Sequence, residues 1–138
     1  PITNGGNKEG LWRTPSKDEL LYLFNGRPDA DRLRLETCMV CGAKGGMLFP
    51  DNFWSNRLRF PIDITSTSNS FNEEQWKILE SLGVVFFPKY LMRTSYYSYY
   101  DIVCWTSDRY GCIDIDGDFY KSLIYVNHLP VRLIKDLK

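Results

Sequence analysis

The chain has 138 residues, of which 43% are hydrophobic, 25% charged and 15% aromatic. This length and balance predict one globular domain rather than a disordered segment. Seventeen basic and seventeen acidic residues cancel, so no overall charge attracts nucleic acid or an anionic membrane. We therefore expect no nucleic-acid partner. Since no apolar run approaches the roughly 20 residues of a membrane helix, we also expect no membrane insertion.

The N-terminal part of the sequence predicts a flexible arm and then a capped helix. Residues 1–10 are polar and rich in glycine and asparagine, so we expect an arm there and a single domain over residues 11–138. Ser16 and Glu19 have the spacing of a capping box, in which each side chain accepts a hydrogen bond from the other residue's backbone N–H. The helix should end near Gly26. The residues of its buried face recur at helical spacing and are Leu20, Leu23 and Phe24.

Two strands and a turn are predicted next. Residues 33–41 form a segment of strand length, and residues 47–49 form a second apolar segment. The glycines between these two segments predict the turn, which we expect over Gly42, Gly45 and Gly46. A long polar connection, residues 51–70, then leads to the second helix.

The second helix begins with another capping pattern. Asn72 lies three residues before Gln75, so the amide side chains can bond each other's backbone N–H. Gly83 is placed to end the helix. Residues 84–87 are an apolar run typical of a buried strand, and we expect Pro88 to end it.

The C-terminal half predicts strands joined by loops. Residues 112–115 and 118–120 flank Asp116 and Gly117, a dipeptide favoured in two-residue hairpin turns. Residues 129–134 predict a last strand. Two helices, each followed by strands, and then a β-rich half indicate an α+β fold.

The cysteines suggest no metal or redox centre. Cys38 and Cys41 have the spacing of a zinc or redox pair, but a zinc site requires two further ligands. Cys104 and Cys112 are not closely spaced, and the only histidine is His128. We therefore expect Cys38 and Cys41 to be buried, free thiols without zinc.

Several blocks of the sequence, in order, resemble those of one family. They are WRTPSKDE at residues 12–19, LFN at 23–25, GMLFPD at 46–51, GVVFFP at 83–88, WTS at 105–107 and VRLIKD at 131–136. The chain resembles the major paralogous domain family of secreted proteins from gut Bacteroidetes and Fibrobacter, and the likeness covers residues 11–137.

This resemblance implies a C-type-lectin-like fold: two helices packed on a small twisted antiparallel sheet, with a loop-rich C-terminal half that carries the ligand face. Formylglycine-generating enzymes and the variable proteins of diversity-generating retroelements are similar in fold. The family also implies an extracellular or cell-surface location. Because such a scaffold hosts both enzymes and binders, the fold alone does not choose between them.

The residues argue against catalysis and against a metal. The oxidases of this fold use a close cysteine pair that binds copper, and the spacing of Cys104 and Cys112 differs from that pair. Asp114, Asp116 and Asp118 alternate as oxygen ligands do, but they do not match a calcium loop. We therefore expect no enzyme activity, no cofactor and no metal.

The most distinctive feature is a tract of tyrosine and serine in the C-terminal half. Tyrosine supplies rigid, amphipathic contact area, and serine, aspartate and glycine add adaptable hydrogen bonds, as in antibody paratopes. Four tyrosines lie within residues 96–100, and neighbours on a strand point to opposite faces, so some should face solvent. We predict a site that binds a protein or a carbohydrate. Its residues are Tyr96, Tyr97, Tyr99, Tyr100, Asp108, Arg109, Tyr110, Phe119 and Tyr120.

The resulting hypothesis is a recognition domain, either a variable protein of a diversity-generating retroelement or a relative of fixed sequence. Two alternatives are an oxidase like the formylglycine-generating enzymes and a structural adhesin subunit of the cell surface. In each case we expect the same core: Trp12, Leu20, Phe24, Phe49, Trp76, Leu79, Val85, Phe86, Trp105 and Leu133.

Overall fold

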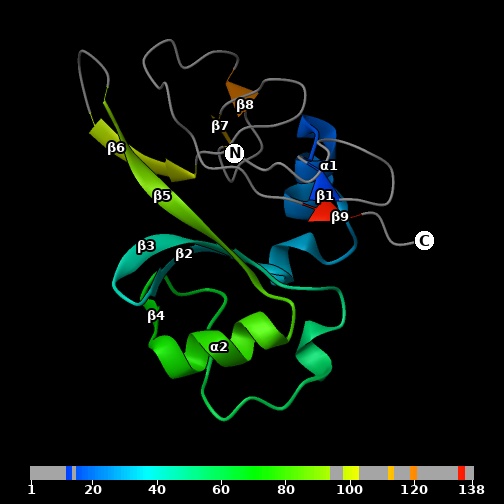
Figure 1. Cartoon of the computed structure of the whole chain (residues 1–138), viewed down its shortest axis with the longest axis vertical. Coiled ribbons are helices and arrows are strands. Elements are labelled where there is room, and N and C mark those ends of the chain that lie inside the picture. The colour runs from blue at the N-terminus through cyan, green and yellow to red at the C-terminus, as the bar shows by residue number, and fades with distance from the viewer. Residues whose placement is uncertain are drawn as a thin grey trace.

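Figure 1 shows a computed structural model of the chain. It describes the backbone of residues 12–13, 15–93, 98–102, 112–113, 119–120 and 134–135, and the side chains of residues 15–89. The helical segments are α1 (Lys17–Leu21), the π-helix η1 (Tyr22–Gly26), the 3-10 turns η2 (Ala30–Arg32) and η3 (Phe53–Ser55), and α2 (Glu73–Ser81). The strands are β1 (Trp12–Arg13), β2 (Arg34–Val40), β3 (Ala43–Leu48), β4 (Asn69–Phe71), β5 (Val85–Arg93), β6 (Ser98–Ile102), β7 (Cys112–Ile113), β8 (Phe119–Tyr120) and β9 (Ile134–Lys135).

Both predicted capping boxes are present. The backbone N–H of Glu19 donates to Ser16 Oγ at 3.2 Å, and that of Ser16 donates to Glu19 Oε2 at 2.8 Å. At α2, Asn72 and Gln75 exchange the equivalent pair of bonds, each 2.9 Å long. Each box satisfies N–H groups that have no partner within the helix itself, which explains why the two helices begin where the sequence predicts.

The first helix changes its winding after little more than one turn. From Tyr22 the chain continues as a π-helix, and the N–H of Arg27 donates to Tyr22 O, five residues back, at 2.8 Å. The predicted end at Gly26 is confirmed, whereas the wider π-turn was not predicted.

Seven strands form one sheet in the order β4-β2-β3-β5-β6-β7-β8. All neighbours are antiparallel except β2 and β4, which are parallel. The α+β class is confirmed, but the expectation of an antiparallel sheet is wrong at this edge. The chain returns to the sheet edge through a long connection before β4, and a connection of that length permits parallel pairing.

The turn between β2 and β3 contains only Cys41 and Gly42. Their φ angles are 49° and 82°, so both residues are left-handed, as in the two-residue hairpins that match strand twist. The prediction that Gly45 and Gly46 also belong to the turn is wrong, because both lie within β3. A Cβ atom on Gly45 would lie 2.4 Å from the ring of Phe86, so close packing accounts for this glycine.

Pro88 does not end its strand, as the sequence suggested, because β5 continues to Arg93. Pro88 is the last residue of β5 that pairs with β3, and Lys89 is the first that pairs with β6. Proline lacks an N–H for the ladder; here it stands where the strand passes from one partner to the next.

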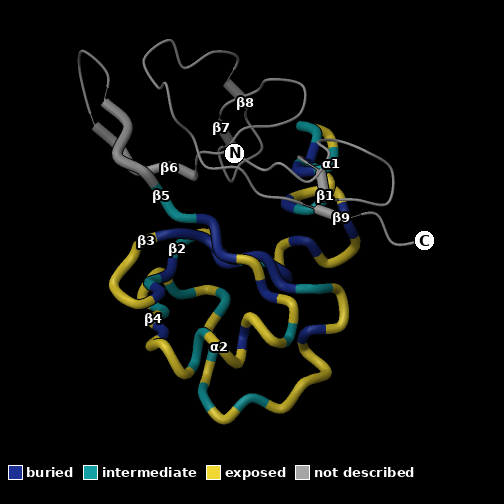
Figure 2. The backbone as a smooth tube through the Cα atoms, in the orientation of Figure 1, coloured by how far each residue is buried: buried dark blue, intermediate teal, exposed yellow. Residues whose placement is uncertain are grey.

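The core lies on both faces of the sheet. One cluster packs α2 and its flanking segments against β2, β3 and β5, and a smaller one packs α1 and η1 against β3 and β5. Neighbouring residues divide between them: Met47 and Phe86 belong to the first cluster, Leu48 and Phe87 to the second. The two helices therefore cover opposite faces, and Figure 2 shows buried residues concentrated along the central strands.

Most of the expected core that can be assessed is confirmed. Leu20, Phe24, Phe49, Leu79 and Phe86 are buried. Trp76 is only half-buried and packs at the margin of the larger cluster, and Val85 is exposed, so its assignment to the core is wrong. Strand alternation places Val85 on the face opposite Phe86. Three of the expected core residues have side chains outside the described part: Trp12, Trp105 and Leu133.

The C-terminal strands agree in part with the sequence. β7 pairs antiparallel with β8, Cys112 opposite Tyr120 and Ile113 opposite Phe119, which confirms that the two predicted segments pair. The register differs by one residue from that of a two-residue turn at Asp116 and Gly117, which would set Ile113 opposite Tyr120; the turn itself lies outside the described residues. In the described part, the predicted last strand is represented by Ile134–Lys135, which pairs with Trp12–Arg13.

Candidate functional site

The tyrosine-rich tract meets the sheet at β6. This strand pairs with the second half of β5, and the register sets Tyr99 opposite Met92 and Tyr100 opposite Leu91. Because consecutive strand residues lie on opposite faces, Tyr99 and Tyr100 occupy different faces of the β5–β6 ribbon.

Two further predicted site residues, Phe119 and Tyr120, form β8. Four of the nine predicted site residues therefore lie on β6 and β8, two strands of one sheet that are separated by the single strand β7. The other five lie outside the described residues; they are Tyr96, Tyr97, Asp108, Arg109 and Tyr110.

A cross-sheet contact ties the start of the β5–β6 ribbon to the core. Lys89 Nζ donates to Thr37 Oγ1 on β2 at 3.0 Å, spanning the strand β3. Beside it, burial raises the pKa of the Cys38 thiol to about 12, although the positive charge of Lys89 acts in the opposite sense. The Cys38 thiol is therefore protonated near neutral pH, and a protonated thiol is a poor nucleophile.

The two cysteines of the early pair have different environments. Both are free thiols; Cys38 is buried in β2, whereas Cys41 is exposed at the hairpin turn. The expectation that both are buried is wrong for Cys41, because the turn is one residue earlier than the glycines suggested. Within residues 15–89, no three histidine, cysteine or carboxylate side chains gather to hold a metal.

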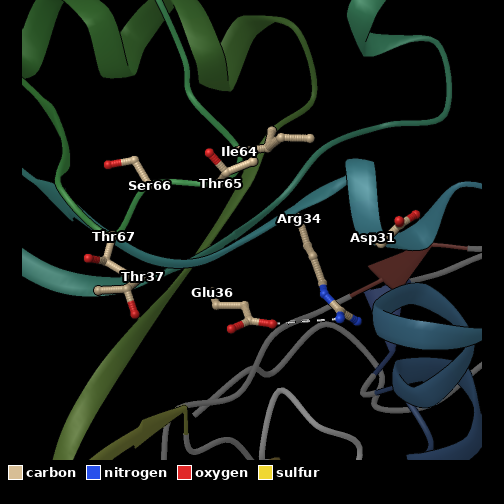
Figure 3. Close-up of a pocket in the computed structure, with 8 residues that line it drawn as sticks. All are labelled: Asp31, Arg34, Glu36, Thr37, Ile64, Thr65, Ser66 and Thr67. Carbon is tan, nitrogen blue, oxygen red and sulfur yellow. Dashed lines mark ion pairs between the residues drawn. The ribbon is translucent and has the colours of Figure 1, made fainter.

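A polar cavity of about 170 Å³ opens beside β2 (Figure 3). One side is the strand β2 with the adjoining turn η2, and the other is the loop before β4. None of the predicted site residues lies in this region. The one sequence signal for it is the run of hydroxyl residues 65–68, which lies within the predicted polar connection. The cavity is lined by Asp31, Arg34, Glu36, Thr37, Ile64, Thr65, Ser66 and Thr67.

A β-bulge shapes the strand side of this cavity. Leu35 pairs with Met47 and Cys38 with Gly45, so two residues, Glu36 and Thr37, face the single residue between them on β3. On a regular strand, consecutive side chains point to opposite faces. The bulge instead lets Glu36 and Thr37 line the same cavity, and redirecting a side chain in this way is a common role of bulges.

Hydrogen bonds within the chain hold the loop side of the cavity. The Asn69 side-chain amide donates to the carbonyls of Asp63 and Ser66 at 2.7 and 3.1 Å. Asp63 Oδ1 accepts from the hydroxyl and the N–H of Thr65, at 2.7 and 2.9 Å. The Thr65 hydroxyl and then its N–H lower the pKa of the Asp63 carboxyl, because both stabilise its charged form.

No helix in the part of the chain that the structure describes is long and apolar enough to cross a membrane. Comparison of the chain with protein-family models, with curated proteins and with solved structures finds no match in any of the three.

Proposed function

We propose that this chain is a non-enzymatic recognition domain, which binds a protein or a carbohydrate through the surface formed by its C-terminal strands and their loops. The binding residues are the tyrosine-rich set predicted from the sequence. The resemblance noted above supports a C-type-lectin-like scaffold and an extracellular or cell-surface location for this function.

The main support is the way the sheet divides into two parts. The strand β3 and the first half of β5 have buried side chains on both faces, and β2 has them on the face that α2 covers. The strand β5 then leaves β3 and pairs with β6. A well-packed core thus supports the strand that bears the tyrosines, and sites on rigid elements lose less entropy when they bind.

Composition gives the second support. Tyrosine has two side-chain torsions, a large contact area and a hydroxyl, so it binds proteins and sugars at a small entropic cost. Since Tyr99 and Tyr100 lie on different faces of the ribbon, we expect one of them to contact the ligand directly.

The test uses the full chain with single alanine substitutions of Tyr99 and Tyr100. Tyr22→Ala is the matched control, because Tyr22 is 55% exposed on η1, outside the tyrosine-rich tract. Each protein is melted to assess folding and then applied to a glycan array and to a panel of purified cell-surface proteins.

We expect one of Tyr99→Ala and Tyr100→Ala to lower affinity for a bound glycan or protein at least about tenfold, as for an interface hot spot of roughly 1.4 kcal/mol or more. Its melting temperature should stay close to that of Tyr22→Ala. If both substitutions unfold the domain, the tract is part of the core. If neither changes binding, the ligand surface lies elsewhere.

A further inference from the structure

We infer that the cavity beside β2 is a second binding site, which takes a small, neutral, polyhydroxylated ligand of the size of one monosaccharide unit. It uses side chains remote in sequence from the tyrosine-rich tract, so it is independent of the function proposed above.

The lining contains both hydrogen-bond donors and hydrogen-bond acceptors, as a sugar-binding site requires. A sugar hydroxyl is both donor and acceptor, so its site needs carboxylates to accept and hydroxyls to donate. Asp31 and Glu36 supply two carboxylates, and three residues of the loop carry hydroxyls, of which that of Thr65 already donates to Asp63 and can only accept from a ligand. Ile64 adds an apolar surface for the C–H groups of a sugar ring.

Several of these groups remain available. Within residues 15–89, the Asp31 carboxylate and the Thr67 hydroxyl make no hydrogen bond. Thr37 Oγ1 accepts from Lys89, and its own proton can still be donated to a ligand. Glu36 is 58% exposed and lies 3.7 Å from Arg34, a distance too long for a hydrogen bond.

The arrangement of charge favours a neutral ligand over an anion. Arg34 is the one cation of the lining, but its Nη1 already donates to the Phe24 carbonyl at 2.6 Å and to the side chain of Asn25. Its Nη2 lies beside Glu36. With Nη1 already bonded and the Glu36 carboxylate beside Nη2, the positive charge of Arg34 is largely offset, and the two carboxylates of the lining repel an anion.

The volume of the cavity is large enough for one sugar ring. A cavity of about 150 Å³ accepts one benzene molecule, so the cavity of about 170 Å³ beside β2 accepts a single six-membered ring. Because the loop side is already held by the Asn69 and Asp63 bonds, binding requires little further ordering of that segment.

The experiment is an amide NMR titration of the ¹⁵N-labelled full chain with glucose, galactose, mannose and N-acetylglucosamine in turn. Each sugar is raised to about 50 mM, well above the Kd on the order of 1 mM expected of a ligand this small. Inorganic phosphate is titrated separately. The variants are Thr67→Val and Glu36→Gln, which keep side-chain shape, and the control is Ser70→Ala, an exposed residue of β4 outside the lining.

We expect at least one sugar to shift the amides of residues 34–37 and 64–67. Thr67→Val and Glu36→Gln should each weaken binding about fivefold, the effect of one lost hydrogen bond, while Ser70→Ala binds as the wild type does. Dispersed spectra show that each variant is folded, and if one variant fails to fold the other decides. No shift with any sugar, a shift with phosphate alone, shifts confined to β6, or full binding by both variants would each overturn the inference.

Discussion

The packing around Gly45 leaves no room for a methyl group. A Cβ atom there would lie 2.4 Å from the Phe86 ring and 2.4 Å from the Phe87 carbonyl oxygen, whereas ordinary contacts begin at 3.4 Å. For Gly45→Ala, both neighbours would therefore have to move by about 1 Å. One is a ring packed against Trp76, and the other is backbone of β5, so neither can move without disturbing the sheet.

The magnitude follows from these two contacts. Forcing an extra methyl group into a packed core costs about 1–3 kcal/mol, and a weakened ladder hydrogen bond adds about 1 kcal/mol. We therefore expect Gly45→Ala to lower the free energy of unfolding by about 3 kcal/mol. For a domain of this size, that loss corresponds to a fall in Tm on the order of 10 °C.

Gly42→Ala is the matched control. Gly42 has φ of 82° and no atom within 4 Å of the position of an added Cβ. Alanine there would lower the free energy of unfolding by about 1 kcal/mol, because the left-handed backbone conformation is unfavourable for it. Urea melts of the wild type, Gly45→Ala and Gly42→Ala, with equal m-values, separate the cost of the steric clash from the cost of the left-handed backbone. If Gly45→Ala is no less stable than Gly42→Ala, the register of β3 against β5 and the packing of Phe86 over Gly45 are incorrect.

Three further predictions concern side chains of the core and its edge. Arg27 is buried and donates to two backbone carbonyls and to Asp51, so Arg27→Met should cost about 2–4 kcal/mol in a urea melt. Asp51→Asn should cost less than about 1 kcal/mol, because the Asp51 side chain is 84% exposed and exposed ion pairs contribute little; equal losses would contradict this. The pKa of Cys38 is raised to about 12, so the stability due to its protonated thiol is complete below the ordinary pKa of about 8.5 and declines as pH rises toward the folded value. Melts of the wild type above pH 9 or so should therefore lose more stability than melts of Cys38→Ala, and parallel pH curves would refute this. Trp76→Ala should cost about 2–4 kcal/mol in denaturant melts, since the ring packs edge-on against Phe86 at 6.0 Å between centroids but is only half-buried; a loss below about 1 kcal/mol would mean that α2 does not pack as described.

Local signals in the sequence predicted local structure well. Each capping box requires two residues three positions apart, and both helices begin where Ser16 and Asn72 indicated. Gly83 follows α2 with φ of 91°, a conformation that costs glycine little. These features depend on neighbours in the chain, so a single sequence contains the information they need.

Features that depend on contacts between distant segments were mispredicted or missed. Gly45 resembles a turn glycine until Phe86 is seen to pack over it, and Pro88 resembles a strand end until β5 is seen to change partners there. The parallel pairing of β4 with β2 likewise depends on where a long connection returns. Four residues of the predicted site lie in described strands: Tyr99, Tyr100, Phe119 and Tyr120. The cavity beside β2 could not be predicted, because the alternation of hydrophobic and polar residues does not reveal where a bulge occurs.

The bulge in β2 is better explained by the cavity than by the core. Leu35 and Cys38 both face the larger core cluster, and one residue between them would satisfy strand alternation. A strand with that single residue would keep Leu35 opposite Met47 and Cys38 opposite Gly45, the pairs observed. It would also bring only one side chain to the cavity. The extra residue therefore adds nothing to these core contacts, and its effect is to present Glu36 and Thr37 together, a carboxylate beside a hydroxyl, to whatever occupies the cavity.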